Sequence, residues 1–514
     1  MQLQRPVFRR QAAPVRVLFG RGLVASPRIR PGQAKNAAGA QPETSLIRAR
    51  CRTNTRRFRL PCCSPARRLD CQFVAETAPF AGLKPSVRLH FAWPLVHEVV
   101  VTGMGIVCPL GVGAEAVWTS LQSGRSGVRV VPELADAGLP IPIAGDVADF
   151  DPKQYVKPRK SLKVMSRETQ LGFTASEMAW AAARLDDAGV DPDRLGVTSG
   201  SNMFCPEVDE LASAYHASDG GGGNFDFARW GREGLREIFP LWLLKYLPNM
   251  APAHTSIVHD ARGPSNSIVA GDTSGLLAVI EAADVVARGH ADVMLAGGTS
   301  STIGWMDLLW HAGARLSRRI AEPERACRPF DADRDGFVGG EGAAMFVLET
   351  RAHAAARGAP PLATVLGYGR RHEPAAIATY RPTGASIAAA IEAALRMGGL
   401  AASQVGHVNA HGLSTEIDDR VEAQAIRDTL GDVPVTAPKS WMGNSGAAAG
   451  AVELAVSLLG LQHGVIPPTL NYETPDPNCP VNVTTQFTPA RSPVVLALSH
   501  KTTGQAVSLL LAAE

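Results

Sequence analysis

One stretch of the sequence places a carboxylate where a protein can stabilise negative charge. Residues 263–278 have the pattern of a buried strand, a tight turn and a helix that opens at Asp272. A side chain at such a turn lies at the positive end of the helix, where backbone N–H groups without intrahelical partners favour an anion or an oxyanion. Asp272 is therefore a candidate catalytic residue, although an aspartate here is also a good helix N-cap.

A second acidic stretch has the outline of a metal site. Residues 331–336 place three aspartates and a glycine at positions 1, 3, 5 and 6 of a calcium-binding loop. The bidentate position is Gly342, with Glu341 one place early, and the flanks have the pattern of a loop and a strand rather than two helices. The glycines at 103–113 do not give a dinucleotide-binding spacing either. We expect no metal and no cofactor.

The composition is that of a soluble α/β protein with an unusual first part. The chain has 514 residues and is 45% hydrophobic, which is enough for a large core. Residues 1–95 hold 18 Lys and Arg against 3 acidic residues, so the remainder carries a net negative charge. Eight scattered cysteines without CxxC spacing fit a reducing compartment better than a disulfide framework. We expect a cytoplasmic protein without a membrane partner.

Residues 1–95 form an Arg-rich extension with ten prolines and no periodic hydrophobic pattern. We predict that this segment is disordered. Three interpretations compete: a transit peptide, a nucleic-acid-binding arm, or translated sequence upstream of the true start. The few serines and many prolines argue against the first, and a charge run without interleaved aromatic residues argues against the second. We favour a start near Val96 and expect no nucleic-acid partner.

Strand and helix patterns alternate over the rest of the chain. This alternation indicates largely parallel sheets covered by helices. The second part repeats the first in outline, so the sequence predicts two similar β/α halves. The expected strands include 98–107, 195–200, 363–368 and 405–412, and the expected helices 169–185, 384–397, 416–430 and 446–463.

Several long motifs carry a resemblance to a known family. The turn at 263–278 with its following strand, the string Cys327–Gly342 and the string Gly464–Cys479 occur in the order found in β-ketoacyl-acyl-carrier-protein synthases. The chain from about Glu98 onward resembles these condensing enzymes. The resemblance implies a thiolase-like α/β fold with a five-layered αβαβα architecture, made of halves at 96–350 and 351–514. It also implies that 239–250 helps to build an acyl pocket and a dimer contact.

The resemblance places four residues in the catalytic centre. Its nucleophile is a cysteine, but a gap-free match puts Asp272 at that position, and no cysteine lies between Cys205 and Cys327. Thr273 and Ser274 are hydroxyl alternatives, but their helical placement points them elsewhere. The first histidine corresponds to His411 and the lysine to Lys439, whereas the second histidine is replaced by Asn444. An asparagine amide donates a hydrogen bond but exchanges no proton near neutral pH.

The C-terminal loop also departs from the family. Residues 499–506 replace a glycine-rich sequence, and Lys501 falls near the position of the gating phenylalanine. A cation at the gate and an anion at the nucleophile suggest compensation. We therefore hypothesise that Lys501 or His500 approaches Asp272. Removing one partner of a buried pair costs about 3–5 kcal/mol.

One basic cluster stands out on the acidic body. Because carrier proteins are acidic, the cluster is a candidate docking patch. The alternative is a solvated start of a helix. The cluster comprises Lys157, Arg159, Lys160 and Lys163.

Three functions remain open. The first is a pseudoenzyme like the chain-length factors, which pairs with an active synthase and shapes the acyl tunnel. The second is an acyltransferase or decarboxylase in which Asp272 and His411 act as an acid–base pair, assisted by Asn444 and Lys439. The third is an ordinary condensing enzyme, which the missing cysteine disfavours. We favour the first, with an acyl carrier protein and either a second copy or an active ketosynthase as partners.

Overall fold

The structure is a computed structural model that describes residues 97–202, 206–304, 306–308, 316–374 and 382–514. The predicted extension at 1–95 lies outside these residues. Among the described residues, no helix is both long enough and apolar enough to cross a membrane. The first strand, β1 (Val99–Cys108), begins where the sequence becomes apolar, and all of its residues are buried.

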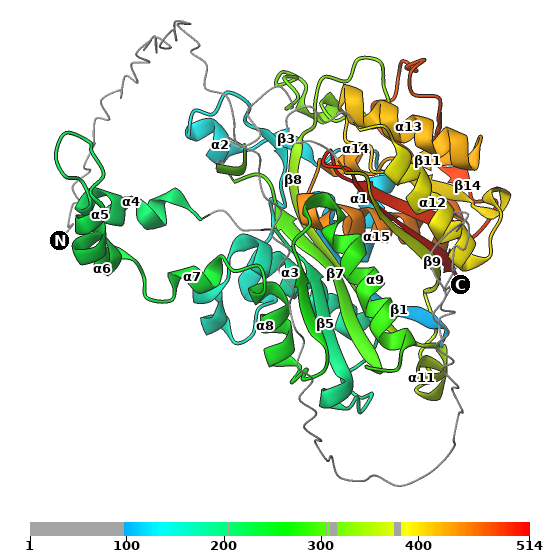
Figure 1. Cartoon of the computed structure of the whole chain (residues 1–514), viewed down its shortest axis with the longest axis horizontal. Helices are drawn as coiled ribbons and strands as arrows, with labels where there is room; N and C mark the ends of the chain where they lie inside the picture. Colours follow the sequence, from blue (N-terminus) through cyan, green and yellow to red (C-terminus); the bar gives the residue numbers. More distant parts are fainter. Residues whose placement is uncertain (1–96, 203–205, 305, 309–315, 375–381) are drawn as a thin grey trace, which may run out of the picture. The chain divides into compact units, whose positions relative to one another are not determined.

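Two sets of strands form one large sheet system (Figure 1). The first half contributes, in spatial order, β1, β8 (Gly339–Thr350), β7 (Val293–Ser301), β5 (Leu195–Gly200) and β6 (Ser265–Ile268). The second half contributes β9 (Ala363–His372), β16 (Gln505–Ala513), β15 (Val494–His500), β10 (His407–Asn409) and β11 (Pro434–Thr436).

The two halves have the same pattern of strand pairing. In the first, β5 pairs in parallel with β6 and β7, whereas β8 pairs antiparallel with β7 and β1. In the second, β10 pairs in parallel with β11 and β15, whereas β16 pairs antiparallel with β15 and β9. The predicted repeat is therefore present. The expectation of largely parallel sheets is wrong for the β8 and β16 pairings. For β16 the physical reason is the turn after β15, which is too short for the crossover that a parallel pair needs.

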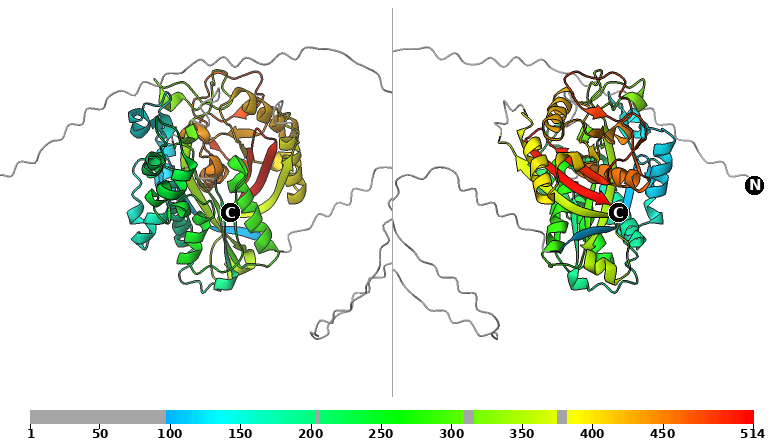
Figure 2. Two further views of the ribbon diagram at one scale, coloured as in Figure 1. Left: turned by 60° about the vertical axis from the view of Figure 1, so that its left-hand side comes forward. Right: turned by 90° about the vertical axis from the view of Figure 1, so that its right-hand side faces the viewer.

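Helices form three further layers around these sheets (Figure 2). The outer helices of the first half are α3 (Arg167–Ala182) and α8 (Met250–Val258), and those of the second are α12 (Ala385–Gly398) and α13 (Glu416–Leu430). The middle layer consists of α9 (Ser274–Ala287) and α15 (Ala449–Gln462), which share one core with strands of both halves. This order gives the five layers that the resemblance implied.

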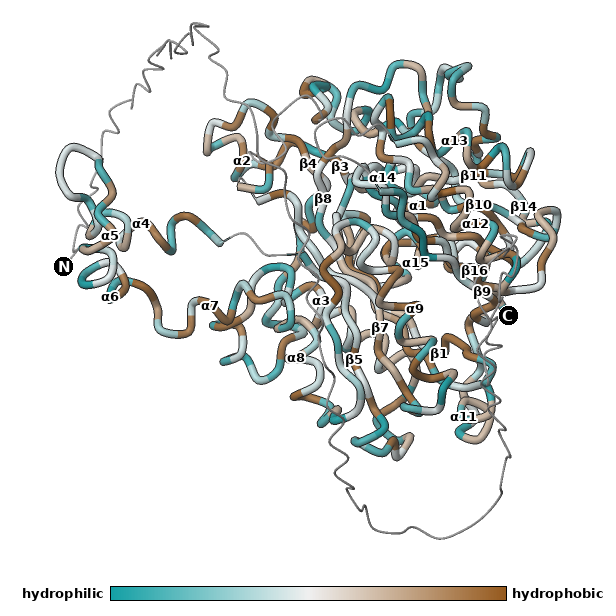
Figure 3. The backbone as a smooth tube through the Cα atoms, viewed as in Figure 1, coloured by the Kyte–Doolittle hydropathy of each residue, from teal (hydrophilic) through white to brown (hydrophobic). Residues whose placement is uncertain are grey.

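Helix α15 is in the middle layer because it is apolar on every side. All its residues from Ala449 to Leu461 are buried, as a helix between two sheets requires. Figure 3 shows hydrophobic residues gathered along α9, α15 and β7. Glu453 is the one charged residue in α15, and it is 2% exposed. A buried charge of this kind requires a partner.

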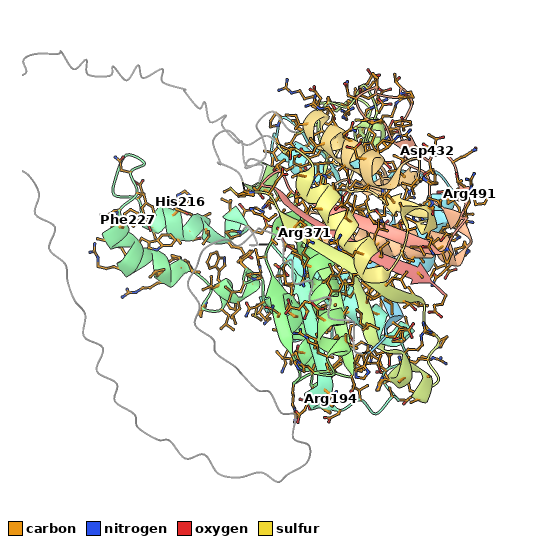
Figure 4. The ribbon with its side chains drawn as sticks, turned by 45° about the vertical axis from the view of Figure 1, so that its right-hand side comes forward. Arg194, His216, Phe227, Arg371, Asp432 and Arg491 are labelled. Atoms are coloured by element: carbon orange, nitrogen blue, oxygen red, sulfur yellow. The ribbon has the colours of Figure 1, made fainter. Side chains whose placement is uncertain are left out.

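The segment from α4 (Val208–Ala217) to α7 (Trp242–Lys245) packs mainly on itself. The Trp230 ring contacts the rings of Tyr215 and Phe225 at 5.4 and 5.6 Å between centroids. Figure 4 shows His216 and Phe227 on this segment, and the Phe227 side chain is 82% exposed. The Gly-rich loop at 219–223 is exposed. The expected pocket and dimer role of 239–250 stays a prediction.

Candidate active site

Asp272 lies in a short turn that glycine makes possible. The turn is a 3-10 helix, Gly271–Thr273, between β6 and α9. Gly271 has φ of 66°, so a larger residue would be strained there, and the end of the Lys501 side chain, whose Nζ would lie 2.8 Å from a Cβ, would have to move aside. The N-cap of α9 is Thr273, without a side-chain capping bond. The interpretation of Asp272 as a simple N-cap is therefore wrong.

The Asp272 side chain instead turns toward two groups of the second half. Its Oδ2 lies 3.6 Å from Nε2 of His411 and 3.4 Å from Nδ2 of Asn444. Burial alone would raise the pKa of this carboxyl, but the His411 ring and the charges of Lys439 and Lys501 lower it to about 2. Asp272 is therefore an anion at neutral pH, although its side chain remains 23% exposed.

His411 is held as a neutral ring with its proton on Nε2. Lys439 Nζ lies 3.0 Å from His411 Nδ1 and donates to the His411 carbonyl oxygen at 2.7 Å. An ammonium group only donates, so Nδ1 must accept, and the ring proton must lie on Nε2, facing Asp272. Burial and the Lys439 charge lower the pKa of His411 to about 4, although Asp272 opposes them.

Lys439 is the centre of a buried ion pair that the sequence interpretation missed. Its side chain is 1% exposed and donates to Glu453 of α15. Burial raises the pKa of Glu453 to about 7, against the effect of Lys439. The signal was present in the sequence, because Glu453 is the only acidic residue in the apolar run 446–463.

Asn444 is fixed by its own backbone and side chain. Its backbone N–H donates to Val338 O at 2.8 Å, and its carbonyl accepts from Thr302 at 2.8 Å. The side-chain Oδ1 accepts from the backbone of Gly446 at 3.2 Å. The Nδ2 donor therefore points toward Asp272.

The two hydroxyls beside Asp272 are engaged elsewhere. Thr273 is fully buried, and its Oγ1 lies 3.0 Å from Gln505 Oε1. Ser274 Oγ donates to Gly271 O at 2.6 Å and accepts from Ala270 N–H at 2.9 Å. These bonds agree with the expectation that neither hydroxyl replaces the nucleophile.

The hypothesis about Lys501 and His500 has a mixed outcome. Lys501 lies against Gly271, so its charge is adjacent to Asp272. Among the described residues, however, the side chains that contact the Asp272 carboxylate are those of His411 and Asn444. His500 pairs with Glu422 instead, at 3.6 Å between Nε2 and Oε2. The sequence interpretation did not identify Glu422.

The other candidate surfaces lie outside this centre. The basic cluster Lys157–Lys163 is exposed around a 3-10 helix. A cavity of about 1070 Å³ lies beside the start of α3 and is lined by Arg167, Glu168 and Glu341 among others. None of the four candidate catalytic residues lines that cavity, so we place the site on the convergent side chains instead.

The acidic string at 331–336 braces the loops below the site. Asp331 accepts hydrogen bonds from Arg328 and from the backbone N–H groups of Asp333, Glu473 and Thr474, at 2.7–2.9 Å. These contacts engage both carboxylate oxygens. Asp331 therefore joins the segment 328–333 to the loop at 473–474.

Together these groups form an anion-binding site, which the carboxylate of Asp272 occupies. The His411 and Asn444 donors converge on one oxygen of Asp272, with Lys439 behind the histidine. Neither Asp272 nor His411 has a pKa near 7, so neither suits proton exchange at neutral pH. The donors suit stabilisation of a developing negative charge.

The repeated halves and this centre define a thiolase-like protein. Residues 97–354 match "Beta-ketoacyl synthase, N-terminal domain" and residues 362–473 match "Beta-ketoacyl synthase, C-terminal domain". The chain belongs to the β-ketoacyl synthase family. A 3-oxoacyl-[acyl-carrier-protein] synthase 2 of Coxiella burnetii is 35% identical over 389 residues, covering 74% of this chain and 90% of that protein.

Other relatives come from polyketide systems. The tetracenomycin polyketide synthase ketoacyl synthase alpha subunit of Streptomyces glaucescens is 36% identical over 388 residues, covering 74% of this chain and 89% of the relative. Among solved structures, a β-ketoacyl synthase from Burkholderia phymatum superposes with a TM-score of 0.73 at 30% identity, covering 81% of this chain and all of that one. The ishigamide ketosynthase/chain length factor gives 0.70 at 28% identity, covering 81% and 99%.

Proposed function

We propose that this chain acts on acyl thioesters of a carrier protein in fatty-acid or polyketide biosynthesis, as a chain-length-factor-like partner of an active ketosynthase. One observation carries the proposal: the Asp272 carboxylate occupies the helix-start turn and faces His411 and Asn444. A carboxylate with a pKa of about 2 is a weak nucleophile. An acyl-aspartate would be a mixed anhydride that hydrolyses, so condensation by this chain alone is disfavoured.

Related structures support the choice of partners. One neighbour is described as a ketosynthase/chain length factor. Another, with a TM-score of 0.68 at 28% identity, covering 82% of this chain and all of that one, is described as a type II polyketide acyl-carrier protein in complex with its ketosynthase. The exposed cluster Lys157–Lys163 supports docking of an acidic carrier protein by charge complementarity.

A second candidate function is decarboxylation of a carrier-bound malonyl group. It is favoured by the retained donors on His411 and Asn444, which suit a thioester carbonyl or an enolate. Under this hypothesis, the substrate must either displace the Asp272 carboxylate from these donors or react with that carboxylate present as a charged group.

The test is mass spectrometry of the full chain mixed with malonyl- and acyl-loaded carrier protein, beside Asp272→Ala and Asp272→Cys. The proposed function predicts no condensation product from the natural chain or Asp272→Ala, and complex formation with the carrier. Loss of carbon dioxide with the natural chain would instead establish the second function, and its disappearance in Asp272→Ala would show that the Asp272 carboxylate takes part. Condensation by the natural chain would overturn the proposal.

A further inference from the structure

A second buried histidine lies against the candidate site. His500 is the last residue of β15 and is 5% exposed. Its ring centroid lies 4.6 Å from that of His411, with the planes at 62°. The preceding residue, Ser499, has its side chain on the opposite face of the strand. Its Oγ donates to the Asp272 carbonyl oxygen at 2.9 Å. The end of β15 therefore contacts both sides of the Asp272–His411 pair.

Glu422 connects His500 to the backbone of the His411 loop. Its side chain is fully buried in α13 and accepts from the N–H groups of His411 and Gly412 at 2.6 and 2.8 Å. Its Oε2 lies 3.6 Å from Nε2 of His500. Burying a carboxylate that has only neutral hydrogen-bond donors costs free energy of folding. Among the described residues, His500 is the one that is placed to form an ion pair with Glu422. Glu422 therefore favours the charged form of His500.

The charges around His500 agree with this assignment. Glu422 and Asp418 of α13 favour its protonation, whereas burial and Lys439 oppose it, and the pKa of His500 is raised overall. On its remaining side it faces the His411 ring. Two rings at this distance do not both hold a proton readily, because like charges repel strongly in a buried site.

We infer that protonated His500, held by Glu422, is a positioning residue that opposes protonation of His411 alongside burial and Lys439, and so helps to keep His411 a neutral donor toward Asp272. Lys439 acts on the same ring by occupying Nδ1. His411 therefore has two cations beside it, and Lys439 directs its single proton to Nε2. This inference rests on the site that carries the proposed function, and it adds how the protonation state of His411 is controlled.

The test is a histidine-selective NMR titration of the full chain. In the natural protein, His500 is expected to titrate above its ordinary pKa and His411 below it. In His500→Gln, the pKa of His411 is expected to rise by about one unit or more, because a neighbouring positive charge is removed. In Glu422→Gln, the pKa of His500 is expected to fall, because its carboxylate partner is removed.

The matched control is His463→Gln, which changes an exposed histidine stacked on Trp118. It is expected to leave the His411 titration unchanged. A His411 pKa that does not move in His500→Gln, or a His500 in the natural protein that titrates below His411, would overturn the inference. The natural-protein titration decides the point even if a variant does not fold, and it is independent of any carrier or partner assay.

Discussion

Replacing Asp272 by asparagine is expected to destabilise the protein in a pH-dependent way. The folded-state pKa of this carboxyl falls from the ordinary 3.8 to about 2, and each pH unit of pKa difference is worth about 1.4 kcal/mol. The ionised carboxylate therefore contributes about 2 kcal/mol to the free energy of unfolding, and asparagine, which resembles the protonated acid, lacks this contribution. Because the folded pKa is the lower one, the contribution is complete above about pH 5 and is lost as the pH falls toward 2.

The assay is urea denaturation of the natural chain and Asp272→Asn near pH 7 and again near pH 3. The difference between the two proteins should be about 2 kcal/mol near neutrality and should shrink in acid. Asp432→Asn is the control, since the Asp432 side chain is 74% exposed beside Arg427, and exposed pairs contribute under about 1 kcal/mol. An Asp272→Asn protein as stable as the natural one near pH 7 would refute the idea that His411, Lys439 and Lys501 stabilise this carboxylate.

Three further changes have defined outcomes. Glu453→Gln resembles the protonated acid, and the folded-state pKa of Glu453 is raised from 4.5 to about 7, so the natural chain should lose stability relative to this variant in urea denaturation as the pH rises from about 5 to 7; a stability difference that does not change over this range would contradict the burial of this carboxyl. Gly200→Ala places a Cβ 2.5 Å from the backbone N of Gly275 at the start of α9, so the soluble yield and thermal midpoint should fall sharply; an unchanged midpoint would show that this contact relaxes. Lys160→Glu should weaken carrier binding several-fold at low salt and less at high salt, measured by titration calorimetry; equal affinity in both proteins would remove the docking patch from consideration.

The layers of the fold were predictable because the hydrophobic patterns are strong. The predicted helix at 416–430 matches α13, and the apolar run at 446–463 contains α15. Strand direction was less predictable. The pairing of β8 and β16 depends on how loops return across the sheet, which the alternation of strands and helices does not encode.

The site was predictable in its members but not in its electrostatics. The motifs placed Asp272, His411, Lys439 and Asn444, and the structure brings all four together. The role of Glu453 depends on its contact with Lys439, 14 residues away in sequence. The role of Glu422 depends on its contacts with the backbone of His411 and Gly412, 11 and 10 residues away. A single sequence shows such a residue as a charge within a helix and does not show what it faces.

The paired topology makes the site the meeting point of two versions of one turn. In the first half a 3-10 turn, Gly271–Thr273, leads into α9, and in the second half another, Gly446–Ala448, leads into α15, and the two turns contact each other. The turn Gly271–Thr273 carries the Asp272 carboxylate. The segment just before the turn Gly446–Ala448 carries Lys439 and Asn444. Separated from its counterpart, each half would expose the buried side chains of its middle helix and would keep only one partner of the Asp272–His411 contact.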